Sequence, residues 1–296
     1  MSRVAAFWGN TAQTPLQIVE DPFFIERGIT LYVKRDDLIH PHVSGNKWRK
    51  LKYNLLEAEK QGINTLLTFG GAYSNHIAAT AAAGQATGFD TIGIIRGEEL
   101  QTDSNPTLRF ASECGMKLIF VSRKEYRDKE ALTQLFGEGC YSIPEGGSNA
   151  LAVKGVAEVV AEIQTQLNIP VDYLCTPLGT GGTAAGLLSA SAAKVLVFPS
   201  LKIKAEEAKQ MIQQHLSVPE IKAEIMADYH FGGYGKVKGE LWQFIEAFEK
   251  QTNIPLEQVY TGKMMFGIYD LVRKGFFKQG EVIVALHTGG LQGRTK

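Results

Sequence analysis

The stretch FGGAYSNHIAATAAAG, residues 69–84, joins the end of a predicted β-strand to a predicted α-helix through three polar side chains. Ser74 suits the N-cap position of the alanine-rich helix, because its hydroxyl can accept a backbone hydrogen bond there. Capping alone does not explain Asn75 and His76 beside it. The stretch therefore predicts a strand-loop-helix unit of an α/β fold, in which side chains and backbone N–H groups of the loop bind a carboxylate together.

Strand and helix patterns alternate along most of the chain. Strands are expected at residues 31–37, 64–71, 90–97, 117–122, 171–179, 195–200 and 281–290. Helices are expected at residues 46–62, 74–88, 105–115, 129–139, 151–167, 183–193, 206–216, 240–251 and 264–275. This order predicts open, twisted parallel sheets with helices on both faces. Residues from about 46 to 144 form four such units alone, which indicates a small lobe inserted into a larger one.

The composition points to a small ligand. The 296 residues include 31 basic and 31 acidic side chains, so no strong field attracts nucleic acid or an anionic membrane. Cys114, Cys140 and Cys175 lack the spacing of metal or redox motifs, and we expect three buried thiols in a reducing compartment. No apolar stretch suits a signal peptide or a membrane span. The sequence predicts a cytoplasmic protein that acts on a small molecule, not on nucleic acid or a membrane.

A second strand-to-helix turn is rich in glycine. In PLGTGGTAAG, residues 177–186, glycines allow close approach of the backbone to a phosphate, and threonine hydroxyls can add donors. The residues expected to hold the phosphate are Gly179, Thr180, Gly181, Gly182 and Thr183. A bulky residue at Gly181 is expected to weaken cofactor binding far more than folding.

The same turn also matches a loose dinucleotide fingerprint, so a nicotinamide-dependent oxidoreductase is an alternative. That fingerprint needs an acidic residue at the end of the next strand. Here LKIK follows the strand, and Glu206 and Glu207 fall in the next helix.

The stretch HVSGNKWRKL, residues 42–51, favours one cofactor. Lys47 stands at a predicted helix start, where the helix dipole disfavours a cation. A lysine desolvated near a cofactor has a lowered pKa and can form a Schiff base. With a phosphate loop, such a lysine predicts pyridoxal 5'-phosphate. A surface lysine, or a ligand-binding protein that lost its chemistry, are the alternatives. His40 and His42 lack a third ligand of suitable spacing, and no metal is expected.

Eight motifs, in order, resemble those of the 1-aminocyclopropane-1-carboxylate deaminase and D-cysteine desulfhydrase family. They are VKRDDL, SGNKWRKL, GGAYSNH, PEGGSN, GTGGTAAG, YGK, VYTGKMMFGIYDLVRKGFF and LHTGG. The resemblance implies the tryptophan synthase β-type fold, fold type II of the pyridoxal phosphate enzymes. It also implies a large domain from residues 1–49 and 145–296, a small domain from residues 50–144, and a homodimer.

The resemblance also implies roles for individual residues. Lys47 would bind the cofactor covalently, and Asn75 would hydrogen-bond its ring hydroxyl. Ser74, with Tyr73, Asn75 and His76 around it, would bind the substrate, and Ser74 would also be catalytic, as a nucleophile or proton carrier. Tyr234 and Tyr260 would face the substrate as further catalytic groups. Thr261 and Thr288 are the candidates for contact with the pyridine nitrogen.

Residue 261 favours one of the two reactions of this family. The family pattern of the deaminases has a glutamate there, which keeps the pyridine nitrogen protonated, whereas this chain has Thr261. A hydroxyl holds that proton less firmly and suits elimination of a good leaving group. We therefore expect D-cysteine desulfhydrase-like β-elimination, with the deaminase giving 2-oxobutyrate as the alternative. Tyr73 replaces an expected glutamine and residues 189–205 form a shortened segment, so another small amino acid remains open as substrate.

Overall fold

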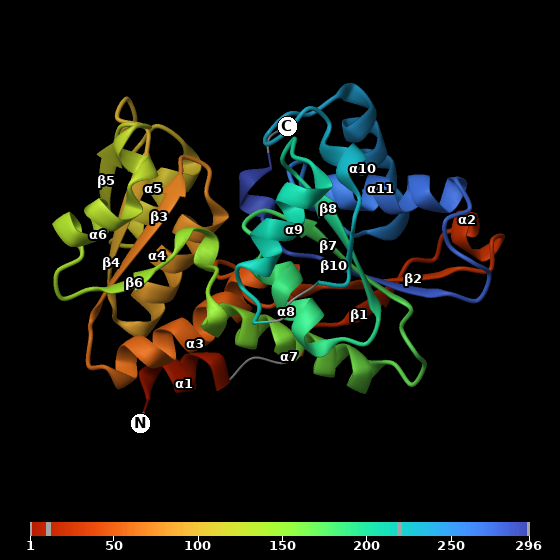
Figure 1. The fold of residues 1–296 in the computed structure, drawn as a ribbon, viewed down its shortest axis with the longest axis horizontal. Coiled ribbons are helices and arrows are strands. Elements are labelled where there is room, and N and C mark those ends of the chain that lie inside the picture. The colour runs from red at the N-terminus through yellow and green to blue at the C-terminus, as the bar shows by residue number, and fades with distance from the viewer. Residues whose placement is uncertain (1, 10–12, 218–220, 295–296) are drawn as a thin grey trace.

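Two β-sheets organise the part of the chain that the computed structural model describes, residues 2–9, 13–217 and 221–294 (Figure 1). In these residues one sheet has six strands in the order β1-β2-β10-β7-β8-β9, and the other has four in the order β5-β4-β3-β6. The strands are β1 (Leu16–Ile18), β2 (Thr30–Lys34), β3 (Thr65–Gly71), β4 (Asp90–Arg96), β5 (Lys117–Val121), β6 (Tyr141–Ile143), β7 (Tyr173–Leu178), β8 (Lys194–Pro199), β9 (Ala223–Ile225) and β10 (Val282–Leu286). All pairs are parallel except β1 with β2, which confirms the predicted α/β class.

Helices fill the connections between the strands. They are α1 (Arg3–Gly9), α2 (Pro22–Ile25), α3 (Asn46–Lys60), α4 (Asn75–Thr87), α5 (Pro106–Glu113), α6 (Lys129–Phe136), α7 (Ala150–Gln166), α8 (Gly182–Ala190), α9 (Ala205–Gln213), α10 (Gly239–Thr252) and α11 (Thr261–Arg273). Every strand and helix expected from the sequence is present, with its ends shifted by a few residues. The elements that were not expected, namely α1, α2, β1, β6 and β9, have three to seven residues each. Such short segments do not complete a recognisable period.

Side-chain caps explain where several of these helices begin. Ser74 accepts a hydrogen bond from the N–H of Ile77 at 3.3 Å and is the N-cap of α4, as predicted. Asn105 and Asn149 cap α5 and α7 in the same way. These side chains satisfy N–H groups that the first helical turn leaves without partners.

The chain path divides the described strands between two lobes (Figure 1). The four-stranded sheet comes entirely from residues 65–143, and strands from before and after it form the six-stranded sheet. Helix α1 packs on the smaller lobe, where Val4 and Trp8 share a buried cluster with Leu51 and Ala82. The exact domain boundaries remain a prediction.

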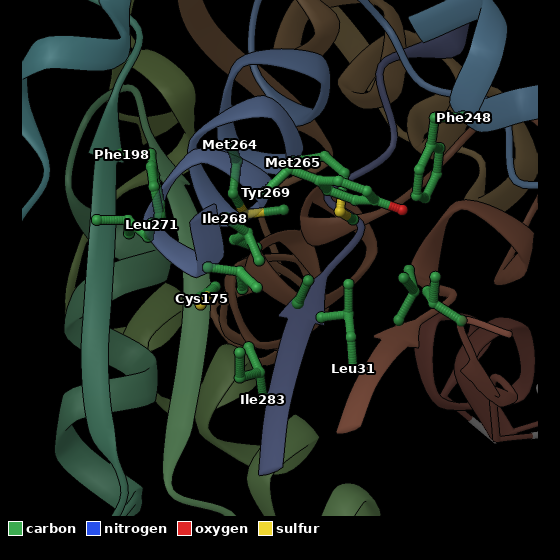
Figure 2. Close-up of a cluster of buried hydrophobic side chains, with 14 of the residues drawn as sticks. Leu31, Cys175, Phe198, Phe248, Met264, Met265, Ile268, Tyr269, Leu271 and Ile283 are labelled. Carbon is green, nitrogen blue, oxygen red and sulfur yellow. The ribbon is translucent and has the colours of Figure 1, made fainter. Parts of the chain in front are cut away.

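Apolar clusters cover both faces of the six-stranded sheet. On one face, α10 and α11 bury Phe248, Met265 and Ile268 against Leu31 and Ile283 of the strands (Figure 2). On the other face, residues of α7, α8 and α9 form a separate buried cluster with β7 and β8. None of the helices among the described residues is long and apolar enough to cross a membrane.

The expectation of three buried thiols is correct only for Cys175. Cys114 and Cys140 are partly exposed, and all three cysteines are free.

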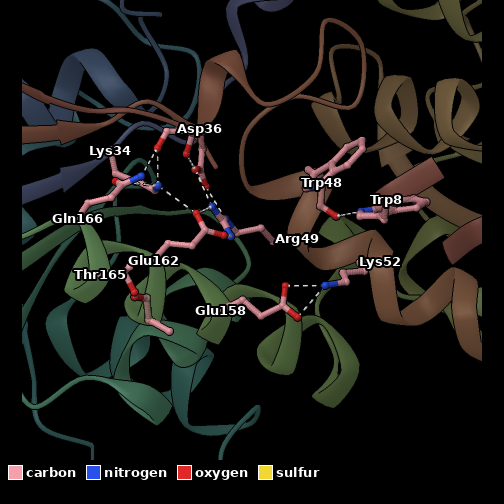
Figure 3. Close-up of polar contacts among 12 residues, drawn as sticks. Trp8, Lys34, Asp36, Trp48, Arg49, Lys52, Glu158, Glu162, Thr165 and Gln166 are labelled. Atoms are coloured by element: carbon pink, nitrogen blue, oxygen red, sulfur yellow. Dashed lines mark hydrogen bonds and ion pairs between the residues drawn. The ribbon is translucent and has the colours of Figure 1, made fainter. Parts of the chain in front are cut away.

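A buried ionic cluster joins α3 to the larger lobe (Figure 3). The Arg49 guanidinium of α3 donates to both carboxylate oxygens of Asp36, with Nε to Oδ2 at 2.6 Å. It also donates to both oxygens of Glu162 on α7 at 2.8 Å. Lys34, at the end of β2, lies 3.0 Å from Glu162. Arg49, Asp36 and Lys34 are almost completely buried, so each charge depends on the others for compensation.

Replacing Arg49 with alanine should lower the free energy of unfolding by about 3–5 kcal/mol, because Asp36 would remain buried without its partner. Urea denaturation of the two proteins measures the difference. The matched control is Lys52→Ala, one turn further along α3, whose pair with Glu158 is partly exposed. That change should cost less than about 1 kcal/mol. Equal losses in the two variants would contradict the structural role given to the Arg49 cluster.

Candidate active site

A cavity of about 570 Å³ lies where the carboxyl ends of strands from both sheets meet. Open α/β sheets place their ligands at such strand ends. Its lining contains twelve of the residues predicted from the sequence: Lys47, Tyr73, Ser74, Asn75, His76, Gly179, Thr180, Gly181, Thr183, Tyr234, Tyr260 and Thr288. Two other predicted residues, Gly182 and Thr261, are described by the structure and lie outside this lining.

Lys47 is the second residue of α3 and lines the cavity. Gly45 before it has a φ of 63°, and a side chain there would collide with the carbonyl of Thr288, so the turn requires glycine. The Lys47 amine donates to Oδ1 of Asn46 at 2.8 Å. Burial lowers the pKa of Lys47 to about 8. A substantial fraction of the amine is therefore neutral near physiological pH, as attack on an aldehyde requires.

The glycine-rich loop connects β7 to α8, and its residues line the same cavity as Lys47. Asn46 links the two elements, because its Nδ2 donates to the Thr183 hydroxyl at 2.8 Å. Gly181 has a φ of 90°, and a side chain there would collide with the backbone carbonyl of Met211. The expectation that substitution at Gly181 mainly affects cofactor binding therefore needs correction, since α9 fixes the backbone behind the loop. At Gly179, in contrast, an added side chain would point toward the Tyr260 ring and not toward backbone atoms.

Lys50 lines the cavity and is a candidate site residue that the sequence analysis missed. Its buried Nζ donates to the Ser148 hydroxyl at 2.9 Å and to the Gly146 carbonyl at 3.0 Å. Ser148 in turn lies 2.6 Å from the Thr180 hydroxyl of the glycine-rich loop. Burial, and then the charge of Lys47, hold the pKa of Lys50 well below its ordinary value. The sequence did contain a signal for Lys50. It follows Lys47 by three residues in a predicted helix, and residues with this spacing share one face of a helix.

The loop that begins α4 brings three polar residues to the other wall. His76 is 2% exposed, and its Nε2 lies 2.7 Å from the Thr68 hydroxyl. The same hydroxyl lies 2.9 Å from the Ile143 carbonyl, which can only accept, so Thr68 ties the His76 ring to the end of β6. The other ring nitrogen, Nδ1, is buried and has no hydrogen-bond partner among the described residues. Burial, followed by the charges of Lys47 and Lys50, keeps the pKa of His76 low and the ring neutral.

Tyr234 and Tyr260 form the aromatic wall of the cavity. Their ring centroids are 6.0 Å apart in an edge-to-face arrangement. Burial, and then Tyr234, raise the pKa of Tyr260, so its hydroxyl is protonated at neutral pH. Tyr73 is an exposed side chain at the rim.

The two threonines expected near the pyridine nitrogen are placed differently. Thr288 lines the cavity next to the turn at Gly45. Thr261 is fully buried, and its hydroxyl lies 3.1 Å from Oε1 of Glu257. Thr288 is therefore the hydroxyl that can reach a ligand directly.

The His40-Pro-His42 segment has a structural explanation. His40 Nδ1 accepts the backbone N–H of Val43 at 3.0 Å, and its ring stacks on Trp48. Among the described residues, no three His, Cys, Asp or Glu side chains gather as ligands for a metal ion.

The arrangement fits a phosphorylated aldehyde. The glycine-rich loop leads into the N-terminus of α8, where backbone N–H groups favour an anion. Lys50 adds a second buried amine beside the loop, Lys47 adds an amine with a lowered pKa, and His76 adds an unpartnered ring nitrogen. The fold and the site thus define an α/β enzyme that binds a phosphate-bearing carbonyl cofactor.

Comparison with known sequences identifies the cofactor. The family described as "Pyridoxal-phosphate dependent enzyme" matches residues 8–289, and the chain belongs to this family. It is therefore an enzyme that depends on pyridoxal phosphate, as predicted, and the nicotinamide alternative is excluded.

The relatives agree with the resemblance seen in the motifs. A Pyrococcus horikoshii protein provisionally named 1-aminocyclopropane-1-carboxylate deaminase is 32% identical over 95% of this chain and 90% of its own length. The Arabidopsis thaliana "Bifunctional D-cysteine desulfhydrase/1-aminocyclopropane-1-carboxylate deaminase, mitochondrial" is 32% identical, over 91% and 74%. The crystal structure of an "ACC deaminase homologue" superimposes with a TM-score of 0.82 at 30% identity, over 99% of this chain and 96% of that one. The predicted fold type is confirmed.

Alanine at Gly181 should destabilise the protein, whereas alanine at Gly179 should mainly weaken cofactor binding. The positive φ alone costs roughly 1–2 kcal/mol for a residue with a Cβ, and the Met211 carbonyl adds a collision. A Cβ on Gly179 would lie 3.3 Å from the Tyr260 ring and would narrow the space in front of the loop. Thermal unfolding of the cofactor-free proteins and fluorescence titration with pyridoxal phosphate separate the two effects. The same unfolding temperature for both variants would contradict this assignment.

Proposed function

We propose that the protein is a pyridoxal phosphate-dependent lyase of the D-cysteine desulfhydrase type, which converts a small amino acid with a leaving group on Cβ to pyruvate and ammonia. The observation that carries the proposal is the Lys47 amine, whose pKa is lowered to about 8 in a cavity that also holds a phosphate-type loop. The name of the bifunctional plant relative supports the same reaction.

The residues that would hold the cofactor lie on three sides of the cavity. Lys47 would bind its aldehyde, and the loop at residues 179–183 with Lys50 would hold its phosphate. Asn75, which lines the cavity and accepts a hydrogen bond from Gln292 at 2.7 Å, is the proposed partner of the ring hydroxyl. When bound, pyridoxal phosphate supplies an electron sink for negative charge at the substrate Cα.

The chain's own residues would perform binding and proton transfer. Ser74 and the N–H groups at the start of α4 would bind the substrate carboxylate. The neutral Lys47 amine, released when the substrate amine takes its place, would accept the proton from Cα. The Cβ–S electron pair would leave on sulfur, and addition of water to the three-carbon product would give pyruvate and ammonia. Tyr234 and Tyr260 would close this side of the cavity to water.

Ring opening of 1-aminocyclopropane-1-carboxylate is the second candidate reaction. The plant relative carries both activities in its name. Against it, Thr288 offers a hydroxyl at the cavity wall, whereas the acidic residues of the lining, Glu99 and Glu145, follow strands β4 and β6 of the four-stranded sheet. A hydroxyl near the pyridine nitrogen suits the elimination with the better leaving group.

Two other expectations remain predictions that rest on the family resemblance and the composition. The protein is expected to act as a homodimer, and it is expected in the cytoplasm.

Replacing Lys47 with alanine should remove the visible absorbance band of the lysine-bound cofactor and lower turnover by at least about 10³-fold, because the proton acceptor is lost. Borohydride reduction followed by peptide mapping should label Lys47 in the parent protein. Lys52→Ala, on the outer face of the same helix, should keep the band and the label. Label on a different lysine would overturn the assignment.

D-Cysteine should be a better substrate than the cyclopropane amino acid, as judged by kcat/KM for pyruvate and sulfide release against 2-oxobutyrate release. L-Cysteine and D-β-chloroalanine, assayed in parallel, report the stereochemical preference and the effect of a better leaving group. If the protein opens the cyclopropane ring faster than it eliminates sulfide, the deaminase is the correct function.

A further inference from the structure

Arg96 lines a part of the cavity to which the proposed mechanism assigns no role. It is the last residue of β4, and in the parallel sheet it pairs with Gly71 of β3 on one side and Val121 of β5 on the other. Because the three strands are parallel, their carboxyl ends lie along one edge of the smaller lobe (Figure 1). Gly71, Arg96 and Arg123 from this edge all line the cavity. The cavity therefore continues from the start of α4 toward β4 and β5.

The Arg96 guanidinium has no acidic partner among the described residues. Its recorded contact is with the face of the Tyr126 ring, whose centroid is 5.6 Å from Cζ. The other charged side chains of this end are paired. Arg123 lies 3.8 Å from Glu99, and Glu145 lies 3.0 Å from Lys129. Arg96 is thus a solvent-exposed cation in the cavity wall that forms no salt bridge among the described residues.

The two lysines of the cavity already have roles in the proposed mechanism. Lys47 gives up its charge to act as nucleophile and base, and Lys50 faces the phosphate loop. The substrate α-carboxylate belongs at Ser74, after the end of β3. Adjacent strands are about 4.8 Å apart, so Arg96 stands one strand further along, where the side chain of a bound amino acid would extend. Leu100 lines the same part of the cavity and offers apolar contact to the stem of such a side chain.

We propose that Arg96 is a specificity-determining residue that binds an anionic group on the substrate side chain. The natural substrate is then an amino acid whose leaving group on Cβ carries a carboxylate or an equivalent anion. This inference rests on the proposed lyase function. For a thioether substrate, the α-proton passes to Lys47 and the Cβ–S bond breaks. Its electron pair leaves on the sulfur of an anionic thiol, and water converts the remaining three carbons to pyruvate and ammonia.

The test compares two nearly isosteric substrates, S-carboxymethylcysteine and its neutral amide, S-carboxamidomethylcysteine, each as both enantiomers. Pyruvate release by the holoenzyme gives kcat/KM for each compound. The ratio of acid to amide is measured in the parent protein and in Arg96→Gln, so that the different reactivity of the two thioethers cancels. The ratio should fall about fivefold or more in Arg96→Gln, which corresponds to about 1 kcal/mol for one partly exposed ionic contact.

Two further variants sharpen the comparison. Arg96→Lys should retain part of the ratio, because the charge remains. Arg123→Gln removes an arginine that is already paired with Glu99 and whose side chain is 80% exposed, so the ratio should change by less than about twofold.

Two results would overturn the proposal. An unchanged ratio in Arg96→Gln, with kcat/KM retained for both compounds, would show that Arg96 does not sense the side-chain anion. Equal losses of kcat/KM for acid and amide would show that it binds the α-carboxylate instead.

Calorimetric titration of the same two compounds into the holoenzymes separates this inference from the lyase proposal. A charge preference in Kd that depends on Arg96, without pyruvate release, would overturn the lyase function and keep the role of Arg96. Pyruvate release without that preference would overturn only the role of Arg96.

Discussion

The ion pair between Arg49 and Asp36 is the contact on which the active site depends most. Asp36 follows β2 of the large sheet, and its backbone carbonyl also accepts the N–H of Gly45 at 3.0 Å. Asp36 thus holds the chain on both sides of Lys47. Glu162 fixes the other face of Arg49 to α7. Burying these charges costs solvation free energy that a hydrophobic contact would not, but charge-assisted bidentate contacts also fix orientation. Lys47 is positioned at the boundary of the two lobes as a result.

The electrostatics of the cavity follow from which charges lack a partner. After burial, the charge of Lys47 lowers the pKa of Lys50, and both lysines lower the pKa of His76. The starts of α4 and α8 add partial positive charge. Such a cavity is stable only with an anion bound or with its amines neutral. A phosphate satisfies the first condition at Lys50, and burial meets the second at Lys47. The same reasoning makes an unpaired Arg96 informative, because it is positive charge beyond what the cofactor needs.

Local sequence signals were sufficient for most of the fold and for part of the site. Periodicity and caps such as Ser74 report on residues close in the chain, so the longer strands and helices could be predicted. Lys47, Ser74 and Gly179 could be proposed as site residues because glycine and polar residues at strand ends have few structural explanations, and all three line one cavity. The partnership of Lys50 with Ser148, and the Met211 carbonyl behind Gly181, join segments that are distant in sequence. No local pattern encodes such contacts. Thr261 showed the same limit, because only the fold revealed Glu257 beside its hydroxyl.

Two buried ionisable side chains, Glu257 and Lys263, position the tyrosines that form the aromatic wall of the cavity. Glu257 accepts the backbone N–H groups of Tyr260 and Thr261 at 2.8 and 2.6 Å, which fixes the start of α11 and with it the Tyr260 ring. Lys263, whose pKa burial lowers to about 8, donates to the carbonyls of His230 and Gly233 and so holds the loop of Tyr234. Each charge has several hydrogen-bond partners, which offsets the cost of its burial. The two tyrosine faces are therefore set by the protein itself, and a substrate must fit between them and the loop at Ser74.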